Sequence, residues 1–360
     1  MLRNEHTLDG THMPLPAGYA DHNISIDGGR WEESRNERGG YGGSGKYDEA
    51  RSFFGVSTMM LFLNLEHITL TNMTFSHAAG FSSQFGHMRG AHFENIRFES
   101  CFADGLHING ESENILIRNV KGEVGDDLVA LNMYDWQNSS VVFGPTRNVV
   151  CEDLELYQTG RYKAIRILPG IYTFDDGSSV DCSLTNALFR KIRGINTFKL
   201  YFQTPCYTIG TAPERGAVGS ADNLFFEDIE IDLSEPIDAL AEYVNSDPVR
   251  GRFAAFELGA NIRQITLEKI NIRLYDKYPL SRLISVGPKS ARVNEYEIFD
   301  PYLSSEVGRL TLEHIAVNGE PCMDAARLVS ETSFDDGNGD GHSTASGVIH
   351  EIFINGRKVR

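Results

Sequence analysis

The chain has 360 residues, which allows one large domain or two of ordinary size. It carries 33 Lys and Arg against 50 Asp and Glu, and a net charge of -17 makes nucleic acid or an anionic membrane a poor partner. A hydrophobic content of 41% excludes a wholly disordered chain, while the apolar runs are too short for a membrane span.

Residues 1–22 show no strand pattern and include Pro14 and Pro16, so we expect an irregular lead-in or an N-terminal cap. Met1 is followed by Leu-Arg-Asn-Glu-His, in which no apolar signal segment is visible. A cytoplasmic protein is therefore expected, and a secreted protein whose signal peptide is missing from the sequence is the alternative. Five scattered cysteines with no Cys-x-x-Cys pair predict free thiols rather than a zinc site or a disulfide framework.

A short phrase recurs along the chain, in which alternating apolar residues flank two polar positions. Its clear copies begin at residues 68, 91, 115, 149, 187, 224, 265 and 310, with an earlier relative at 24 and a partial copy at 349. Alternation with period two predicts strands. The shortest interval, 23 residues, suits one coil of short strands and is too short for a propeller blade of roughly 40 residues.

The repeat therefore predicts an all-β fold, a single-stranded right-handed parallel β-helix over residues 23–360 in which each coil pairs with the next. The longer intervals are then coils that carry loop insertions. A β-sandwich or a propeller with coincidental spacing is the alternative.

A second short strand follows the phrase in several coils. Its inward apolar pairs are expected to be 106/108, 129/131, 165/167, 200/202 and 256/258. Strand alternation then points the residue between each pair outward. Those residues are His107, Ala130, Arg166, Tyr201 and Glu257, which we expect to stack one coil apart.

Three carboxylates precede the second strands of two adjacent coils. Aligning Leu106 with Val129 places Asp104 directly below Asp127, with Asp126 one residue to the side. Like charges this close raise the pKa of at least one carboxyl, and an acid beside ionised neighbours suits glycoside hydrolysis. Turn chemistry is the alternative, because Asp-Gly and Gly-Asp-Asp are common turn sequences. The shared register of the two segments favours a site.

The segments Asp104-Gly-Leu-His-Ile and Gly125-Asp-Asp-Leu-Val-Ala-Leu resemble the Asn-Thr-Asp-Gly and Gly-Asp-Asp motifs of glycoside hydrolase family 28, the polygalacturonases and their relatives. That family belongs to the pectin-lyase-like right-handed β-helix superfamily. The resemblance implies hydrolysis with inversion, in which Asp126 is the general acid and Asp104 and Asp127 hold and activate water. Phe102 and Ala103 stand where the family has Asn-Thr, and the family's Gly-His-Gly is absent.

Further residues are expected to bind substrate: His107, Lys163, Arg166, Tyr201, Trp136, Tyr134, Lys199 and Glu257. Arg166 and Lys163 lie one coil above the carboxylates and would contact a uronate or a hydroxyl-rich sugar; the alternative is that they neutralise the Asp cluster. Tyr134 and Trp136 follow the Asp-Asp strand, where a sugar-stacking platform is expected; the alternative for Trp136 is that it covers exposed core. His107 would orient substrate or a carboxylate, or face solvent without a role.

The sequence thus predicts a glycoside hydrolase that cleaves a poly- or oligosaccharide, with a uronate-containing, pectin-like glycan as one candidate. No metal or other cofactor is expected, and the oligomeric state stays open. The segment from Asp336 to Asp340 matches the first half of a calcium loop, but Gly347 stands where a glutamate is needed, so a polar turn is expected. The alternatives are a polysaccharide lyase on the same fold and a non-catalytic carbohydrate-binding β-helix.

Overall fold

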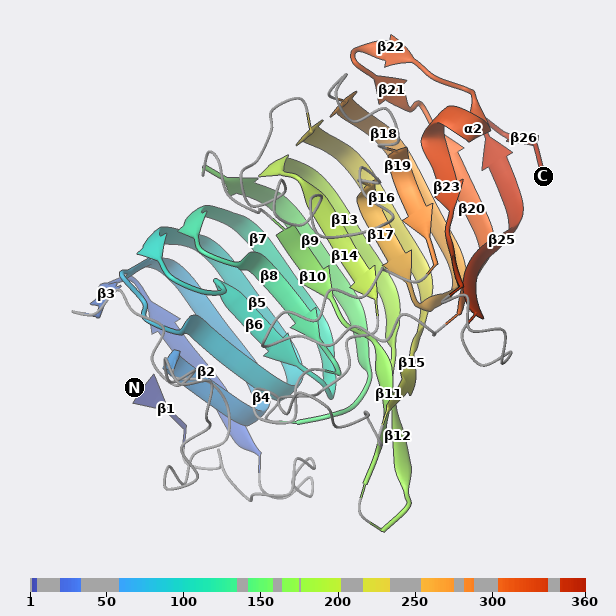
Figure 1. Ribbon diagram of the computed structural model, residues 1–360. Coiled ribbons are helices and arrows are strands. Elements are labelled where there is room, and N and C mark those ends of the chain that lie inside the picture. The colour runs from blue at the N-terminus through green and yellow to red at the C-terminus, as the bar shows by residue number, and fades with distance from the viewer. Residues whose placement is uncertain are drawn as a thin grey trace.

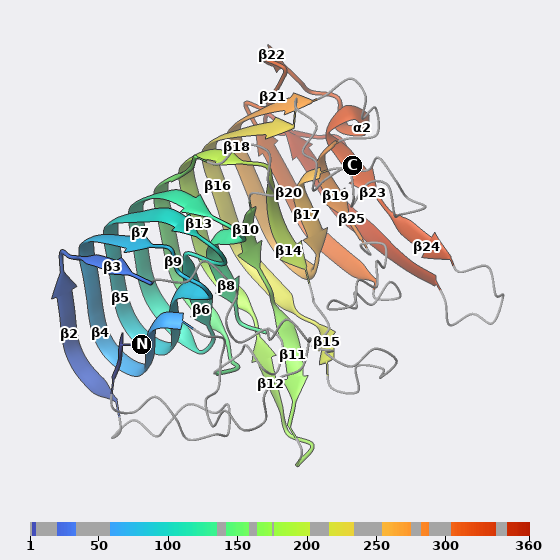
Figure 2. The same ribbon diagram turned by 60° about the vertical axis from the view of Figure 1, so that its left-hand side comes forward.

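The computed structural model describes residues 2–4, 20–33, 58–134, 142–157, 164–174, 176–201, 216–233, 254–274, 282–287, 304–335 and 344–360. This part of the chain is nearly all β, and its helix is the four-residue α2 (Ala325–Leu328). Among the described residues, no helix has the length and apolar character needed to span a membrane. Figures 1 and 2 both show the strands stacked side by side along one axis, with the early strands at one end and the late strands at the other.

Copies of the repeated phrase form one parallel ladder, the first ladder. Its strands are β2 (Asp21–Asp27), β3 (Arg30–Glu32), β4 (Thr58–Ser76), β5 (Phe81–Cys101), β7 (Ser112–Val124), β9 (Thr146–Leu156), β13 (Leu184–Ile195), β16 (Ser220–Leu233), β18 (Asn261–Leu274), β20 (Ser305–Glu313), β21 (Ala316–Val317) and β25 (Thr344–Ile354). Each of the eight predicted phrase starts pairs with the next, beginning with Ile68 and Ala91 and ending with Ile265 and Leu310. The predicted register of the repeat is confirmed.

The predicted second strands form another parallel ladder, the second ladder, together with the first halves of β4 and β5. Its other strands are β1 (Leu2–Arg3), β6 (Leu106–Asn109), β8 (Asp127–Asn132), β10 (Ala164–Ile167), β14 (Thr197–Tyr201), β17 (Ala254–Gly259), β19 (Arg282–Val286) and β23 (Val329–Glu331). The chain alternates between the two ladders, so successive coils lie on one another. Because β4 and β5 run through both, the ladders belong to one continuous sheet.

The polar positions inside the phrase are corners of the coil. Asn72, Asn95 and Asn119 have φ values of 57°, 56° and 50°, a left-handed conformation that asparagine tolerates better than most residues. Their amides also bond across coils, at 2.9 Å from Asn95 Nδ2 to Asn72 Oδ1 and 2.7 Å from Asn119 Nδ2 to Asn95 Oδ1. The same residues thus turn the chain and tie neighbouring coils together.

Between the ladders lies a continuous apolar core. Its aromatic side chains stack from coil to coil, with ring centroids 4.8 Å apart for Phe189 and Phe226 and also for Phe198 and Phe256. The four described cysteines, Cys101, Cys151, Cys182 and Cys322, are buried free thiols, as expected. Coil-to-coil packing of this kind makes each coil depend mainly on its two neighbours.

One predicted alignment in the second ladder is wrong. Arg166 pairs with Lys199, and Lys199 pairs with Glu257, so Lys199 rather than Tyr201 occupies the outward column. Tyr201 pairs instead with Gly259. A strand pattern repeats every two residues, so a shift of two leaves it unchanged, and only the pairing with the neighbouring coil decides the register.

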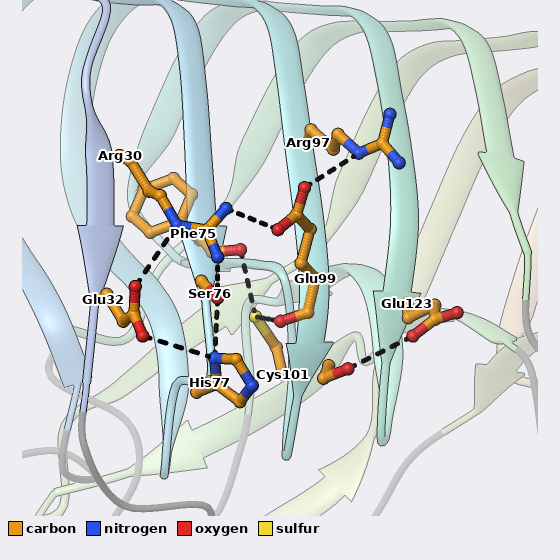
Figure 3. Close-up of polar contacts among 10 residues, drawn as sticks. Arg30, Glu32, Phe75, Ser76, His77, Arg97, Glu99, Cys101 and Glu123 are labelled. Atoms are coloured by element: carbon orange, nitrogen blue, oxygen red, sulfur yellow. Dashed lines mark hydrogen bonds and ion pairs between the residues drawn. The ribbon is translucent and has the colours of Figure 1, made fainter.

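Several short strands lie beside the two ladders. They are the antiparallel sheet of β11 (Gly170–Thr173), β12 (Ser179–Cys182) and β15 (Gly216–Val218), and near the C-terminus β22 (Glu320–Pro321), β24 (Ser333–Asp335) and β26 (Arg357–Lys358). At the N-terminal end, Arg30 contacts Glu99 Oε2 at 2.5 Å and Ser76 Oγ at 2.8 Å, which ties β3, β4 and β5 together (Figure 3). The division into a lead-in over 1–22 and one domain over 23–360 stays a prediction.

Candidate active site

The glycines of the two Asp motifs allow adjacent coils to approach closely. A Cβ on Gly105 would lie 2.6 Å from the carbonyl oxygen of Leu128, and a Cβ on Gly125 would lie 1.9 Å from that of Phe102. Neither position has room for a side chain. The glycine beside each aspartate is therefore required by packing between coils, and the aspartates are held at the entrance of tightly packed strands.

A bulge at the start of β8 sets the direction of Asp127. Ala164 pairs with Asp127 while Ile165 pairs with Val129, so Leu128 is an extra residue in β8. Leu128 and Val129 are consecutive, yet both pack in the core, which breaks the strand alternation at this point. Bulges commonly re-aim side chains next to active sites. Here the bulge aims Asp127 toward Arg166.

Asp104, Asp126 and Asp127 meet as predicted. One carboxylate oxygen from each lies within 4.8 Å of the other two. The side chain of Asp126 is 22% exposed, whereas those of Asp104 and Asp127 are 2% and 0% exposed. Asp126 is therefore the member of the trio that a ligand can reach. These oxygens lie closer together than the roughly 6.5–9.5 Å that usually separates the two carboxyl groups of inverting glycosidases.

Two basic side chains face Asp127 from the next coils. Arg166 Nε lies 2.6 Å from Asp127 Oδ2, and Arg166 Nη2 lies 3.0 Å from Asp126 Oδ1. Lys199 Nζ is 3.9 Å from Asp127 Oδ1. The pKa of Asp127 is nevertheless raised to about 7. Burial is the largest cause, and the negative charges of Asp126 and Asp104 also raise this pKa. Together they outweigh the lowering of the pKa by Arg166 and Lys199. The trio thus contains a carboxyl that changes its protonation state near neutral pH.

Asp104 is held through both of its oxygens. Oδ2 lies 2.7 Å from His107 Nδ1, and Oδ1 accepts from the backbone N–H of Asp127 at 3.2 Å. The ring of Phe81 stacks on His107 with centroids 4.0 Å apart, and His107 is 1% exposed. His107 therefore does not face solvent; it contacts a carboxylate, one of the two roles that the sequence allowed.

Two buried amide side chains, which the sequence did not predict, extend the hydrogen-bonded group that holds His107 and Asp104. Asn109 Nδ2 lies 3.4 Å from His107 Nε2 and donates to the carbonyl oxygen of Asn132 at 2.9 Å, while Gln84 Nε2 donates to Asn109 Oδ1 at 2.9 Å. All of these groups are buried. Gln84 precedes His107 in the same outward column, and aligning the first half of β5 with β6 would have found it.

The expectation for Tyr134 is wrong. Its side chain is fully buried, with its ring centroid 5.8 Å from that of Phe143 and 6.1 Å from that of Tyr172. It is a core residue and presents no face to a sugar, because its ring packs against Phe143 and against Tyr172 of β11. Trp136, Lys163 and the segment from Asp336 to Asp340 lie outside the described residues.

Of the remaining predicted binding residues, some lie beside the trio and others do not. Arg166 and Lys199 lie beside the trio, and Glu257 follows Lys199 in the outward column. For Tyr201 only the backbone pairing is described, which takes it out of that column. In the described part of the chain the trio is also the group with spacing suited to a metal ion, but the guanidinium of Arg166 already lies against two of its three carboxylates.

No protein-family model and no curated protein sequence matches the chain. Solved structures that superpose on it include the catalytic domain of a GH87 alpha-1,3-glucanase in complex with nigerose, with a TM-score of 0.30 and 14% identity. A variant of that domain in complex with tetrasaccharides gives a TM-score of 0.32 and 13% identity. The matches cover 86% of this chain and 63% of the other, so this chain spans less than two thirds of those domains. At such scores the likeness carries no argument about family or activity.

Proposed function

We propose that this chain is a glycoside hydrolase built on a right-handed parallel β-helix and that it cleaves a glycosidic bond in a poly- or oligosaccharide. The observation that carries the proposal is the meeting of Asp104, Asp126 and Asp127 at adjacent coils, with one member partly exposed and another titrating near neutral pH. Paired carboxyls with different protonation states are what glycoside hydrolysis requires.

In the proposed reaction Asp126 is the general acid, because it is the carboxyl of the trio that can touch the leaving oxygen. Its proton goes to that oxygen as the glycosidic C–O bond breaks. A water molecule forms the new bond to the anomeric carbon, and Asp127 accepts the water's proton, which requires substrate binding to open the covered carboxyl of Asp127 to that water. A base with a pKa of about 7 works well near neutral pH. Asp104, held by His107 and by the backbone of Asp127, supplies a fixed negative charge beside them.

The charges around the trio favour a neutral sugar. Arg166 and Lys199 are the cations of the described site, and both face Asp127. Three carboxyls against two cations leave no positive excess to attract a uronate. A uronate-containing, pectin-like glycan is the alternative, which Lys163 would favour if it reached the site.

An activity screen on neutral oligosaccharides and on galacturonides, with reducing ends measured, tests the proposal. We expect turnover on at least one glycan and a loss on the order of 1,000-fold in Asp126→Asn. Asp176→Asn, which changes a carboxyl in an exposed turn, is the matched control and should be unaffected. Binding without turnover, or full activity in Asp126→Asn, would overturn the hydrolase assignment.

The products separate the remaining alternatives. Proton NMR of the fresh product anomer decides between inversion, which the resemblance implies, and retention, which the short carboxyl spacing would suit. A polysaccharide lyase would instead give an unsaturated product that absorbs in the ultraviolet. That reaction requires a basic side chain available to take a proton from the substrate, whereas Arg166 is engaged with two carboxylates.

A further inference from the structure

The orientation of the Asn109 side chain is fixed by its neighbours. Its Nδ2 lies 2.9 Å from the carbonyl oxygen of Asn132, and a backbone carbonyl can only accept a hydrogen bond. The amide nitrogen must therefore be on this side, which leaves Oδ1 to accept from Gln84 Nε2 at 2.9 Å. Since Nδ2 carries two hydrogens, one is used by Asn132 and the second points elsewhere.

That second hydrogen meets His107. Nδ2 of Asn109 lies 3.4 Å from His107 Nε2, so Nε2 must offer a lone pair; a proton there would set two donors face to face in a buried place. The proton of the neutral imidazole is then on Nδ1, which lies 2.7 Å from Asp104 Oδ2. This is the tautomer that gives the Asp104 carboxylate a donor.

From this geometry we infer that His107 is a positioning residue of the proposed active site, kept as the neutral Nδ1–H tautomer by Asn109 so that it orients Asp104. Its role in turnover rests on the proposed function. Asp104 Oδ2 is held by His107, and Oδ1 is held by the backbone N–H of Asp127. The Asp104 carboxylate therefore cannot rotate away from the bulge at the start of β8, which sets the direction of Asp127. The ring of Phe81 covers His107 and keeps water from competing.

The tautomer is measured directly by nitrogen-15 NMR of the histidine side chains in the full chain at pH 7, with His107→Gln used to assign the signal. We expect a protonated Nδ1 and an unprotonated Nε2 at His107. In Asn109→Leu the donor to Nε2 is lost, so a mixture of tautomers should appear. A protonated Nε2 in the unaltered protein, whether as the other tautomer or as imidazolium, overturns the inference.

Kinetics test the positioning role. His107→Leu should lower kcat on the order of 100-fold with KM within about twofold, because a displacement near 1 Å costs about that much. His107→Gln keeps an N–H donor for Asp104 and should recover part of the loss. His87→Gln is the control, since His87 is a buried histidine whose Nδ1 contacts Asn64 at 2.7 Å rather than an aspartate.

The two proposals fail separately. Full activity in a folded His107→Leu protein would refute the positioning role while leaving the hydrolase assignment intact. Absence of any glycan turnover in the unaltered protein, with the Nδ1–H tautomer present, would refute the hydrolase assignment and leave only the tautomer. If the leucine variant does not fold, the nitrogen-15 spectrum and the glutamine variant still decide the matter.

Discussion

Arg166 lies in β10 one coil above Ala130, yet its guanidinium reaches back to Asp127, with Nε 2.6 Å from Oδ2. The same guanidinium contacts Asp126 at 3.0 Å. One arginine thus bridges the partly exposed carboxyl of the trio and one of its two buried carboxyls. Of the two readings that the sequence left open for Arg166, this contact supports neutralisation of the Asp cluster.

Replacing Arg166 should change how Asp127 holds its proton. Arg166 lowers the pKa of Asp127, so Arg166→Gln should move that pKa above its value of about 7. Carbon-13 NMR of the carboxyl carbons across a pH series measures the change. Arg190→Gln is a matched control, because Arg190 pairs with Glu152 at 2.9 Å in the first ladder, away from the trio. An unchanged or lower pKa of Asp127 in Arg166→Gln would contradict the expectation.

Asp127 should also make stability depend on pH. In the folded chain it holds its proton up to about pH 7, whereas its ordinary pKa is 3.8. Between these values the folded state binds more protons than the unfolded state, so the free energy of unfolding falls as pH rises. The loss from this group should be on the order of 4 kcal/mol and should be absent in Asp127→Asn. Thermal unfolding midpoints of both proteins from pH 4.5 to 8 measure it, and parallel curves would refute it.

Tyr134 should matter for stability and not for sugar binding. Tyr134→Ala should destabilise the fold by about 3–5 kcal/mol, the range for removing a large buried aromatic side chain. Tyr134→Phe keeps the packing with Phe143 and Tyr172 and should leave KM within about twofold, since it removes no sugar-stacking surface. Denaturant unfolding and steady-state kinetics measure the two effects. A large rise of KM in a folded Tyr134→Phe protein would show that the Tyr134 hydroxyl contacts the sugar, which would contradict a purely structural role.

Replacing a corner asparagine with alanine should lower the free energy of unfolding more than replacing it with glycine. Asn95 has a φ of 56° and bonds to both Asn72 and Asn119. Asn95→Ala loses these bonds and must still adopt the left-handed conformation, at an expected cost of about 1–3 kcal/mol. Asn95→Gly loses the bonds but adopts that conformation freely, so it should cost less. Equal losses in the two variants would show that the corner conformation contributes little.

The residues that the sequence located correctly are those tied to a repeat. Asp104 and Asp127 could be aligned because Leu106 and Val129 mark the same position in coils of nearly equal length. Tyr201 was misplaced because alternation alone does not distinguish a strand from the same strand shifted by two. Asn109 and Gln84 were missed because buried amides give no pattern: their role depends on side chains from neighbouring coils, and the first half of β5 merges with the phrase that follows it.

The last coil bears on how separate copies of the chain behave in solution. A stack of parallel strands must end in an edge with open hydrogen-bonding groups, which invites a second molecule to join there. Here β26 turns back and pairs with Phe353 and Ile354 in antiparallel fashion, and it places Arg357 and Lys358 along β25. The turn therefore covers part of the edge of β25 with a short strand that carries two cationic side chains, and such a strand is a poor template for pairing with a second molecule.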